Sequence, residues 1–85
     1  MQVKFHKIFK KKFKKLPPWA QKKFYERLEV FLRNDHDAVL RNHSVDKAYP
    51  NCRSINISGD YRAIYYHNGD EVIFIIIGTH AELYK

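Results

Sequence analysis

The apolar run Val72–Ile77 constrains the fold more than any other feature of the chain. Six consecutive strand-forming residues leave neither face of a strand for solvent, which is typical of a strand buried inside a sheet. Segments 52–58 (CRSINIS) and 61–67 (YRAIYYH) also have strand character, and Gly59-Asp60 and Asn68-Gly69 separate the three runs. The Asn-Gly pair favours a type I′ hairpin turn. We therefore expect three consecutive antiparallel strands, the last of which, 71–77, lies in the middle of the sheet.

The N-terminal half predicts one short strand and two helices. Segment 2–5 (QVKF) is the strand that we expect beside 71–77. The first helix has apolar residues at helical spacing and ends before two prolines, because proline disfavours the helical conformation in the residue before it. The second begins at Pro18 or Trp19, where proline is tolerated, and ends near Asn34. The two apolar stripes are Phe5, Phe9, Phe13 and Leu16, and Ala20, Phe24, Leu28 and Phe31.

These elements predict a single α+β domain over residues 1–85. The element order is β-α-α-β-β-β, with an N-terminal helical hairpin packed on one face of a small, mainly antiparallel sheet. Residues 35–51 form a long polar connection, and connections of this kind are often functional. In the strand at 52–58, Ile55 and Ile57 point to one side and Ser54 and Asn56 to the other. The face of the sheet away from the helices is therefore free to carry a site.

Charge and cysteine content limit the classes of partner and the compartment. The chain has 16 Lys and Arg against 9 Asp and Glu, a formal net charge of +7. This excess favours a polyanionic partner: nucleic acid, a ribosome, an acidic protein or an anionic membrane. The single cysteine, Cys52, excludes an intrachain disulfide and is typical of a reducing compartment. No apolar stretch suits a signal peptide or a membrane span, so we expect a cytoplasmic protein without a membrane partner.

Four polar residues are candidates for chemistry. Thr79 and Glu82 form a capping-box pattern, so His80 is either the first residue of a capped helical turn or a proton-transfer group at the end of the buried strand. Asp60 and Arg62 are two residues apart, and they are either a functional pair on one face or a turn residue and its ion-pair partner. His43, in the long connection, is either solvated or catalytic. Histidines and carboxylates lack metal-ligand spacing, and there is no Gly-rich phosphate loop, so we predict no metal and no small-molecule cofactor.

Three segments, taken together, resemble a known family. The segments NHSV (42–45), CRSINISGDYRAIYY (52–66) and IGTHAELYK (77–85) are similar to the RelE/ParE superfamily of toxins from bacterial type II toxin–antitoxin systems. The nearest branch is that of the YafQ-type mRNA endoribonucleases. The basic segment 9–24 is similar to the helical hairpin of that family, and the element order derived above agrees with the RelE-like fold.

The resemblance implies a function and a set of site residues. Members of the family cleave mRNA, characteristically on the translating ribosome, without a metal ion: the ribose 2′-hydroxyl attacks the adjacent phosphate and the 5′-oxygen leaves. It implies a general-acid role for His80, activation of the 2′-hydroxyl by Asp60 or His43, and stabilisation of phosphate charge by Arg62. It also implies RNA contacts and an antitoxin partner that covers the basic, aromatic face. The residues that we expect to contact RNA are Tyr61, Tyr84, Lys10, Lys11, Lys14 and Arg53.

The chain departs from the YafQ pattern at two places. A histidine of that pattern, in the strand before the turn, is replaced by Asn56, which cannot exchange a proton at neutral pH. The loop after His43 reads SVDKAYP in place of the usual Leu-x-Gly segment. Two alternatives therefore stay open: a catalytically silent RNA- or antitoxin-binding protein, and a gyrase inhibitor of the ParE branch, since a fold does not determine a function.

Overall fold

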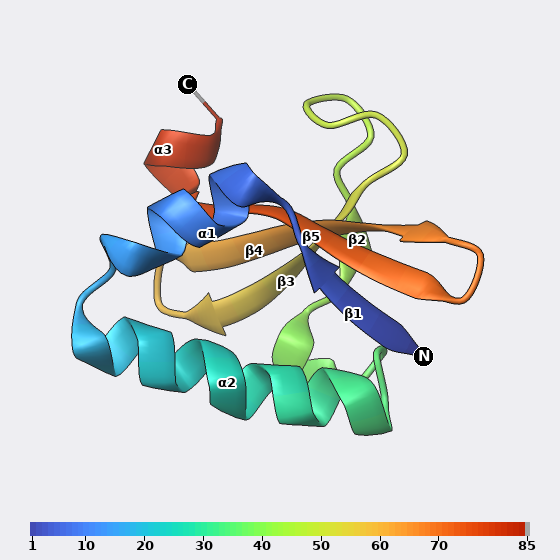
Figure 1. Cartoon of the computed structure of the whole chain (residues 1–85), viewed down its shortest axis with the longest axis horizontal. Coiled ribbons are helices and arrows are strands. Elements are labelled where there is room, and N and C mark those ends of the chain that lie inside the picture. The colour runs from blue at the N-terminus through green and yellow to red at the C-terminus, as the bar shows by residue number, and fades with distance from the viewer. Residues whose placement is uncertain (85) are drawn as a thin grey trace.

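A computed structural model describes residues 1–84 of the chain (Figure 1). The first half contains β1 (Gln2–Phe5), α1 (Lys7–Lys14), α2 (Pro18–Arg33) and a short 3₁₀ helix, η1 (Ala38–Leu40). The second half contains β2 (His43–Ser44), β3 (Arg53–Ser58), β4 (Tyr61–Asn68), β5 (Glu71–Thr79) and a final turn of helix, α3 (His80–Leu83). The predicted β-α-α-β-β-β order is confirmed, and η1, β2 and α3 are added to it.

The sheet has the order β1-β5-β4-β3-β2, so β5 lies in the middle as its apolar sequence predicted. β1 runs parallel to β5, and all the other pairs are antiparallel. Each hairpin closes with a two-residue Gly-Asp turn whose glycine has a positive φ, 51° at Gly59 and 62° at Gly69. The expected type I′ turn at Asn68-Gly69 is wrong, because Asn68 pairs with Glu71 and only Gly69 has a positive φ, which is typical of type II′.

A β-bulge places two consecutive residues of β5 on the same face of the sheet. Tyr65 pairs with Phe74 and Ile64 pairs with Ile76, so Ile75 is an extra residue in β5. Phe74 and Ile77 join the core under the helices, whereas Ile75 and Ile76 pack on the opposite face. The strand thus contributes side chains to two separate hydrophobic clusters.

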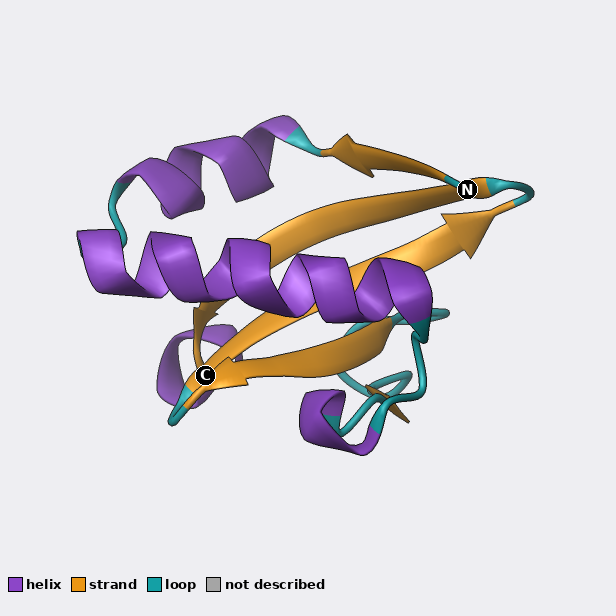
Figure 2. Ribbon diagram, turned by 90° about the horizontal axis from the view of Figure 1, so that it is seen from below, coloured by secondary structure: helices purple, strands orange, loops and turns teal. Residues whose placement is uncertain are grey.

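The larger cluster lies between the sheet and the helical hairpin (Figure 2). Its centre is aromatic: Phe9, Phe24 and Phe31 from the helices meet Tyr65 and Phe74 from the strands, with ring centroids 4.9 to 5.9 Å apart. The residues of the two predicted stripes therefore contribute to the core, but Phe5 belongs to β1 and not to the first helix. Phe5 is the last residue of β1, and His6 caps α1 by accepting a hydrogen bond from the Ile8 N–H.

The smaller cluster lies on the other face of the sheet, beneath the segment 45–52 and α3. Cys52, Ile64 and Leu83 are its buried members. The Tyr49 hydroxyl donates to the Leu83 carbonyl at 2.7 Å and so joins the segment to α3. Burial is the main cause that raises the pKa of Tyr49, so the phenol keeps the proton it donates. This cluster supports the two walls of the candidate site.

Candidate active site

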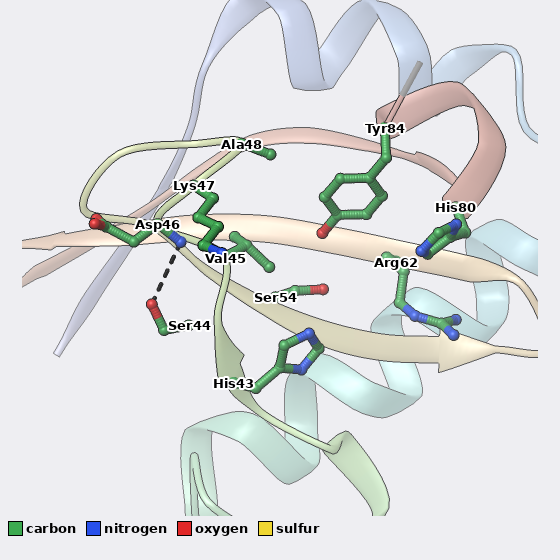
Figure 3. A pocket seen from close by; sticks show the side chains of 10 residues that line it. All are labelled: His43, Ser44, Val45, Asp46, Lys47, Ala48, Ser54, Arg62, His80 and Tyr84. Carbon is green, nitrogen blue, oxygen red and sulfur yellow. Dashed lines mark hydrogen bonds between the residues drawn. The ribbon is translucent and has the colours of Figure 1, made fainter.

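A cavity of about 470 Å³ opens on the sheet face opposite the helical hairpin (Figure 3). Its floor comes from β3 and β4, one wall from β2 and the segment that follows it, and the other wall from α3. The lining residues are His43, Ser44, Val45, Asp46, Lys47, Ala48, Ser54, Arg62, His80 and Tyr84. Four of the predicted site residues, from three distant parts of the sequence, therefore meet in one cavity: His43, Arg62, His80 and Tyr84.

His43 enters the cavity from β2, where it pairs directly with Ser54 of β3. Its Nδ1 atom lies 2.7 Å from the backbone carbonyl oxygen of Arg41. A carbonyl only accepts hydrogen bonds, so this contact requires a proton on Nδ1. The neutral ring then carries its lone pair on Nε2. That arrangement suits a general base.

Arg62 lies on the floor and is oriented by Asn56, its partner across β3 and β4. The Arg62 Nη1 atom donates to Asn56 Oδ1 and to the Gly59 carbonyl, both at 2.7 Å, and to the Tyr61 carbonyl at 3.1 Å. All three bonds use Nη1, so Nε and Nη2 remain available to a phosphate. Asn56, which cannot transfer protons, thus has a different role here: it orients a cation.

His80 is the first residue of α3, and the predicted capping box precedes it. The Thr79 hydroxyl accepts from the Glu82 N–H at 3.3 Å, and Glu82 Oε1 accepts from the Thr79 N–H at 2.8 Å. The His80 N–H donates to the Asp60 carbonyl at 2.9 Å. The imidazole is exposed and lies against the Tyr84 ring, with centroids 4.7 Å apart. The predicted capping box is confirmed, and the capped turn holds His80 at the edge of the cavity, where its proton-transfer role stays a prediction.

Asp60 and Tyr61 lie outside the lining of the cavity. The Asp60 side chain is exposed, because Asp60 is the second residue of the β3–β4 turn and precedes β4, so the strand alternation that would align it with Arg62 does not reach it. Tyr61 packs toward the helices, edge-on to Trp19 with centroids 5.6 Å apart. Only the backbone of Asp60 supports the site, through its bond to His80.

The basic residues predicted to contact RNA also lie away from the cavity. Arg53 donates from Nε to Asn42 Oδ1 at 2.7 Å. Lys10 and Lys14 line a separate groove of about 240 Å³ between α1 and α2, and Lys11 is exposed on α1. Contact between these lysines and RNA stays a prediction, and Lys10, Lys11 and Lys14 do not line the cavity.

Six lining residues were missed by the sequence analysis: Ser44, Val45, Asp46, Lys47, Ala48 and Ser54. The alternation of β3 had placed Ser54 on the correct face, but nothing local marks it as functional. Its Oγ is buried and, within residues 1–84, has no hydrogen-bond partner. Lys47 brings a cation from the wall opposite α3 (Figure 3).

Two further findings concern residues 1–84. No three His, Cys, Asp or Glu side chains lie close enough together to hold a metal ion. None of the helices within this part of the chain has both the length and the apolar character needed to cross a bilayer.

Comparison with protein families assigns the chain to a toxin family. Residues 3–84 match the family described as ParE toxin of type II toxin–antitoxin system, parDE. The chain belongs to this family. A comparison with curated protein sequences found no match.

Several solved toxin structures share the fold of this chain. YafQ from E. coli strain BL21(DE3) aligns with a TM-score of 0.78 at 22% identity, over 99% of this chain and 98% of that one. The E. coli DinJ–YafQ complex aligns with a TM-score of 0.73 at 25% identity, with 99% and 98% covered. The YoeB/ParE toxin from Agrobacterium tumefaciens aligns with a TM-score of 0.78 at 12% identity, over 94% of this chain and 99% of that one. The predicted RelE-like fold is confirmed.

Proposed function

We propose that this toxin is a metal-independent endoribonuclease that cleaves mRNA, on the translating ribosome, and so inhibits translation in the cytoplasm. The observation that carries the proposal is the convergence of His43 and His80 on one cavity whose floor holds Arg62. A base, an acid and a cation are the groups that transesterification of a phosphodiester needs.

The proposed reaction follows from the positions of these groups. His43 Nε2 takes the proton of the ribose 2′-hydroxyl, and the 2′-oxygen forms a bond to the adjacent phosphorus. The bond between phosphorus and the 5′-oxygen breaks, and His80 gives the leaving oxygen its proton. The products are a 2′,3′-cyclic phosphate and a free 5′-hydroxyl. His43 is preferred to Asp60 as the base because Asp60 does not line the cavity.

The remaining groups support binding and charge stabilisation. Arg62 donates from Nε and Nη2 to the phosphate, whose negative charge grows in the transition state. Tyr84, half-buried beside His80, offers a ring on which a base can stack. Lys10, Lys11 and Lys14 attract ribosomal RNA over a longer range.

A cognate antitoxin is the proposed protein partner. The similar toxin YafQ occurs in a complex with DinJ, and membership of a toxin–antitoxin family implies an equivalent partner for this chain. We propose that a segment of the antitoxin covers the basic, aromatic surface with acidic or apolar residues.

The test is cleavage of a defined mRNA programmed on ribosomes by the purified protein. We expect products with 5′-hydroxyl and 2′,3′-cyclic phosphate ends, and a loss of at least a hundredfold in rate for His43→Ala and for His80→Ala. His36→Ala is the matched control, because His36 is an exposed histidine of the same connection outside the cavity. RNA binding without cleavage would indicate a silent binder. Trapped gyrase–DNA complexes without RNA cleavage would indicate the gyrase target that the ParE name of the family suggests.

A further inference from the structure

Strand β2 is too short to hold His43 in place by itself. It pairs with β3 at only two positions, His43 with Ser54 and Ser44 with Arg53. Before it, the connection from α2 is irregular apart from η1. Two ladder pairs at a sheet edge fray easily, yet the His43 ring makes a short, directional contact with the Arg41 carbonyl. A further group must therefore hold this segment.

Asn42 is that group, because its side chain makes three short hydrogen bonds to three parts of the chain. Its Nδ2 donates to the Asp35 carbonyl and to the Tyr65 hydroxyl oxygen, each at 2.7 Å. Its Oδ1 accepts from Arg53 Nε, also at 2.7 Å. An amide has two N–H donors, and both are used. Asn42 thus joins the turn that follows α2 to β3 and β4.

The partners of Asn42 are themselves rigidly held. Tyr65 is 1% exposed and packs edge-on to Phe31, with ring centroids 4.9 Å apart. Arg53 lies directly opposite Tyr65 in the pairing of β3 with β4. Burial is the main cause that raises the pKa of Tyr65, so the phenol stays neutral. The side chain of Asn42 is therefore tied to the core rather than to a mobile surface.

The backbone of Arg41, the residue before Asn42, explains how the hydrogen bonds of the Asn42 side chain act on His43. Arg41 ends η1 in the left-handed conformation, with φ 46° and ψ 45°. Its carbonyl turns back to the ring two residues later and accepts the Nδ1 proton of His43. A non-glycine residue keeps this conformation only where its surroundings hold it there. Asn42, one residue on, is bound to the core and supplies that restraint.

We propose that Asn42 is a positioning residue for His43: its amide holds the Arg41 carbonyl under the ring, which selects the Nδ1–H form and leaves Nε2 free in the cavity. The catalytic meaning of this inference rests on the proposed nuclease function. The claim that Asn42 fixes the tautomer of the His43 ring does not depend on that function.

The first test reads the tautomer directly by nitrogen NMR of the labelled, ligand-free protein at neutral pH. In the wild type we expect the Nδ1 of His43 to carry the proton and Nε2 to be unprotonated. In Asn42→Ala we expect a mixture in which the Nε2–H form is substantially populated. A folded Asn42→Ala protein with the wild-type tautomer would overturn the proposal. Asn34→Ala is the matched control, because it removes one exposed hydrogen bond of the same connection and leaves Asn42 untouched.

The second test measures single-turnover cleavage of ribosome-bound mRNA together with RNA affinity. We expect Asn42→Ala to lower the cleavage rate about ten- to a hundredfold, because a small displacement of the base has a cost of this size. RNA affinity should stay within about twofold of the wild type, since Asn42 does not line the cavity. A variant that cleaves at the wild-type rate would contradict the proposal.

A third variant keeps the proposal testable if Asn42→Ala does not fold. Asn42→Asp retains the shape and the acceptor for Arg53 but loses both donors. We expect partial population of the Nε2–H form and a cleavage rate lowered several-fold, and an unchanged tautomer would overturn the positioning role. If the wild type cleaves no RNA, the proposed function fails, while the tautomer measurement still decides the role of Asn42.

Discussion

The Arg62 guanidinium is oriented by one side-chain amide, that of Asn56, together with the backbone carbonyls of Gly59 and Tyr61. Asn56 Oδ1 lies 2.7 Å from Arg62 Nη1, and both residues are partly buried in paired positions of β3 and β4. An oriented guanidinium presents its remaining N–H groups to a phosphate without first losing rotational freedom. Asn56 is therefore the residue through which the strand sets the phosphate-binding geometry.

Replacement of Asn56 by leucine tests this dependence. Leucine keeps the volume and removes the acceptor, so we expect the cleavage rate to fall about tenfold while the fold persists. Single-turnover cleavage is the measurement. In the background of Arg62→Ala, the same replacement should cause little further loss, because the two residues act as one unit. Independent, additive losses would show that Asn56 acts by another route.

At the scale of elements, α3 and the segment 45–52 form a mutually supported cover on the second face of the sheet. Tyr49 joins them through its hydrogen bond to the Leu83 carbonyl, and its ring lies against that of Tyr84. Gly78 lets α3 fold back closely onto the end of β5. His80 and Tyr84 keep their places in the cavity only while this cover stays closed.

Loss of the Tyr49 hydroxyl should open the cover and change how the free energy of unfolding depends on pH above about pH 10. Tyr49→Phe should lower the free energy of unfolding by about 1 kcal/mol near neutral pH, the usual contribution of one such bond. Burial raises the pKa of Tyr49 in the folded state. Above about pH 10 the unfolded chain therefore loses its Tyr49 phenol proton before the folded protein does. The free energy of unfolding then falls as the pH rises through the folded-state pKa. Urea titrations at pH 7 and above pH 10 should show a shallower alkaline loss for the variant. An equal loss in both proteins would contradict this role.

Gly78→Ala should disturb α3 at its contact with the end of β5. A Cβ atom at this position would lie 3.2 Å from Glu82 Oε1 and 3.6 Å from Leu83 Cδ2. Glu82 Oε1 also holds the Thr79 N–H, so it cannot move away without weakening the capping box. We expect a loss of about 1 kcal/mol of stability, read by thermal melting, and a larger fractional loss of cleavage. A variant with wild-type stability and activity would show that α3 adapts freely.

The same elements show what local sequence patterns can and cannot predict. Phe24 and Phe31 repeat at helical spacing, and the capping residues of α3 follow a local rule, so both were found. β2 was missed because its two residues have no periodicity and are held by the side chain of Asn42. Asp60 was placed beside Arg62 on the assumption that the strand is regular there, but Asp60 belongs to the two-residue turn and β4 begins only at Tyr61.

At the scale of the whole molecule, two groups of cations lie apart. Lys10 and Lys14 line the groove between α1 and α2, whereas Lys47 and Arg62 line the cavity on the other face of the sheet. With this arrangement, the lysines of α1 can raise the rate of association with RNA, while the residues of the cavity determine the rate of cleavage. The net charge of +7 was evident from the sequence, but its position relative to the site required the fold.

Salt dependence should separate these two contributions. If about four phosphates are neutralised, RNA affinity should fall about fiftyfold between 50 and 200 mM salt. Replacement of Lys10, Lys11 and Lys14 by glutamine should make this dependence shallower and leave the single-turnover rate at saturating RNA unchanged. The rate should be measured alongside filter-binding titrations. A fall in the saturated rate would place these lysines at the reacting atoms instead.

We propose that the cavity bearing His43, Arg62 and His80 cleaves mRNA. Primer extension on cellular mRNA after brief induced expression, for the wild type and for His80→Ala, should be the first measurement. We expect discrete new 5′ ends within translated codons for the wild type and none for the variant. A soluble, folded wild-type protein that produces no new ends would contradict it.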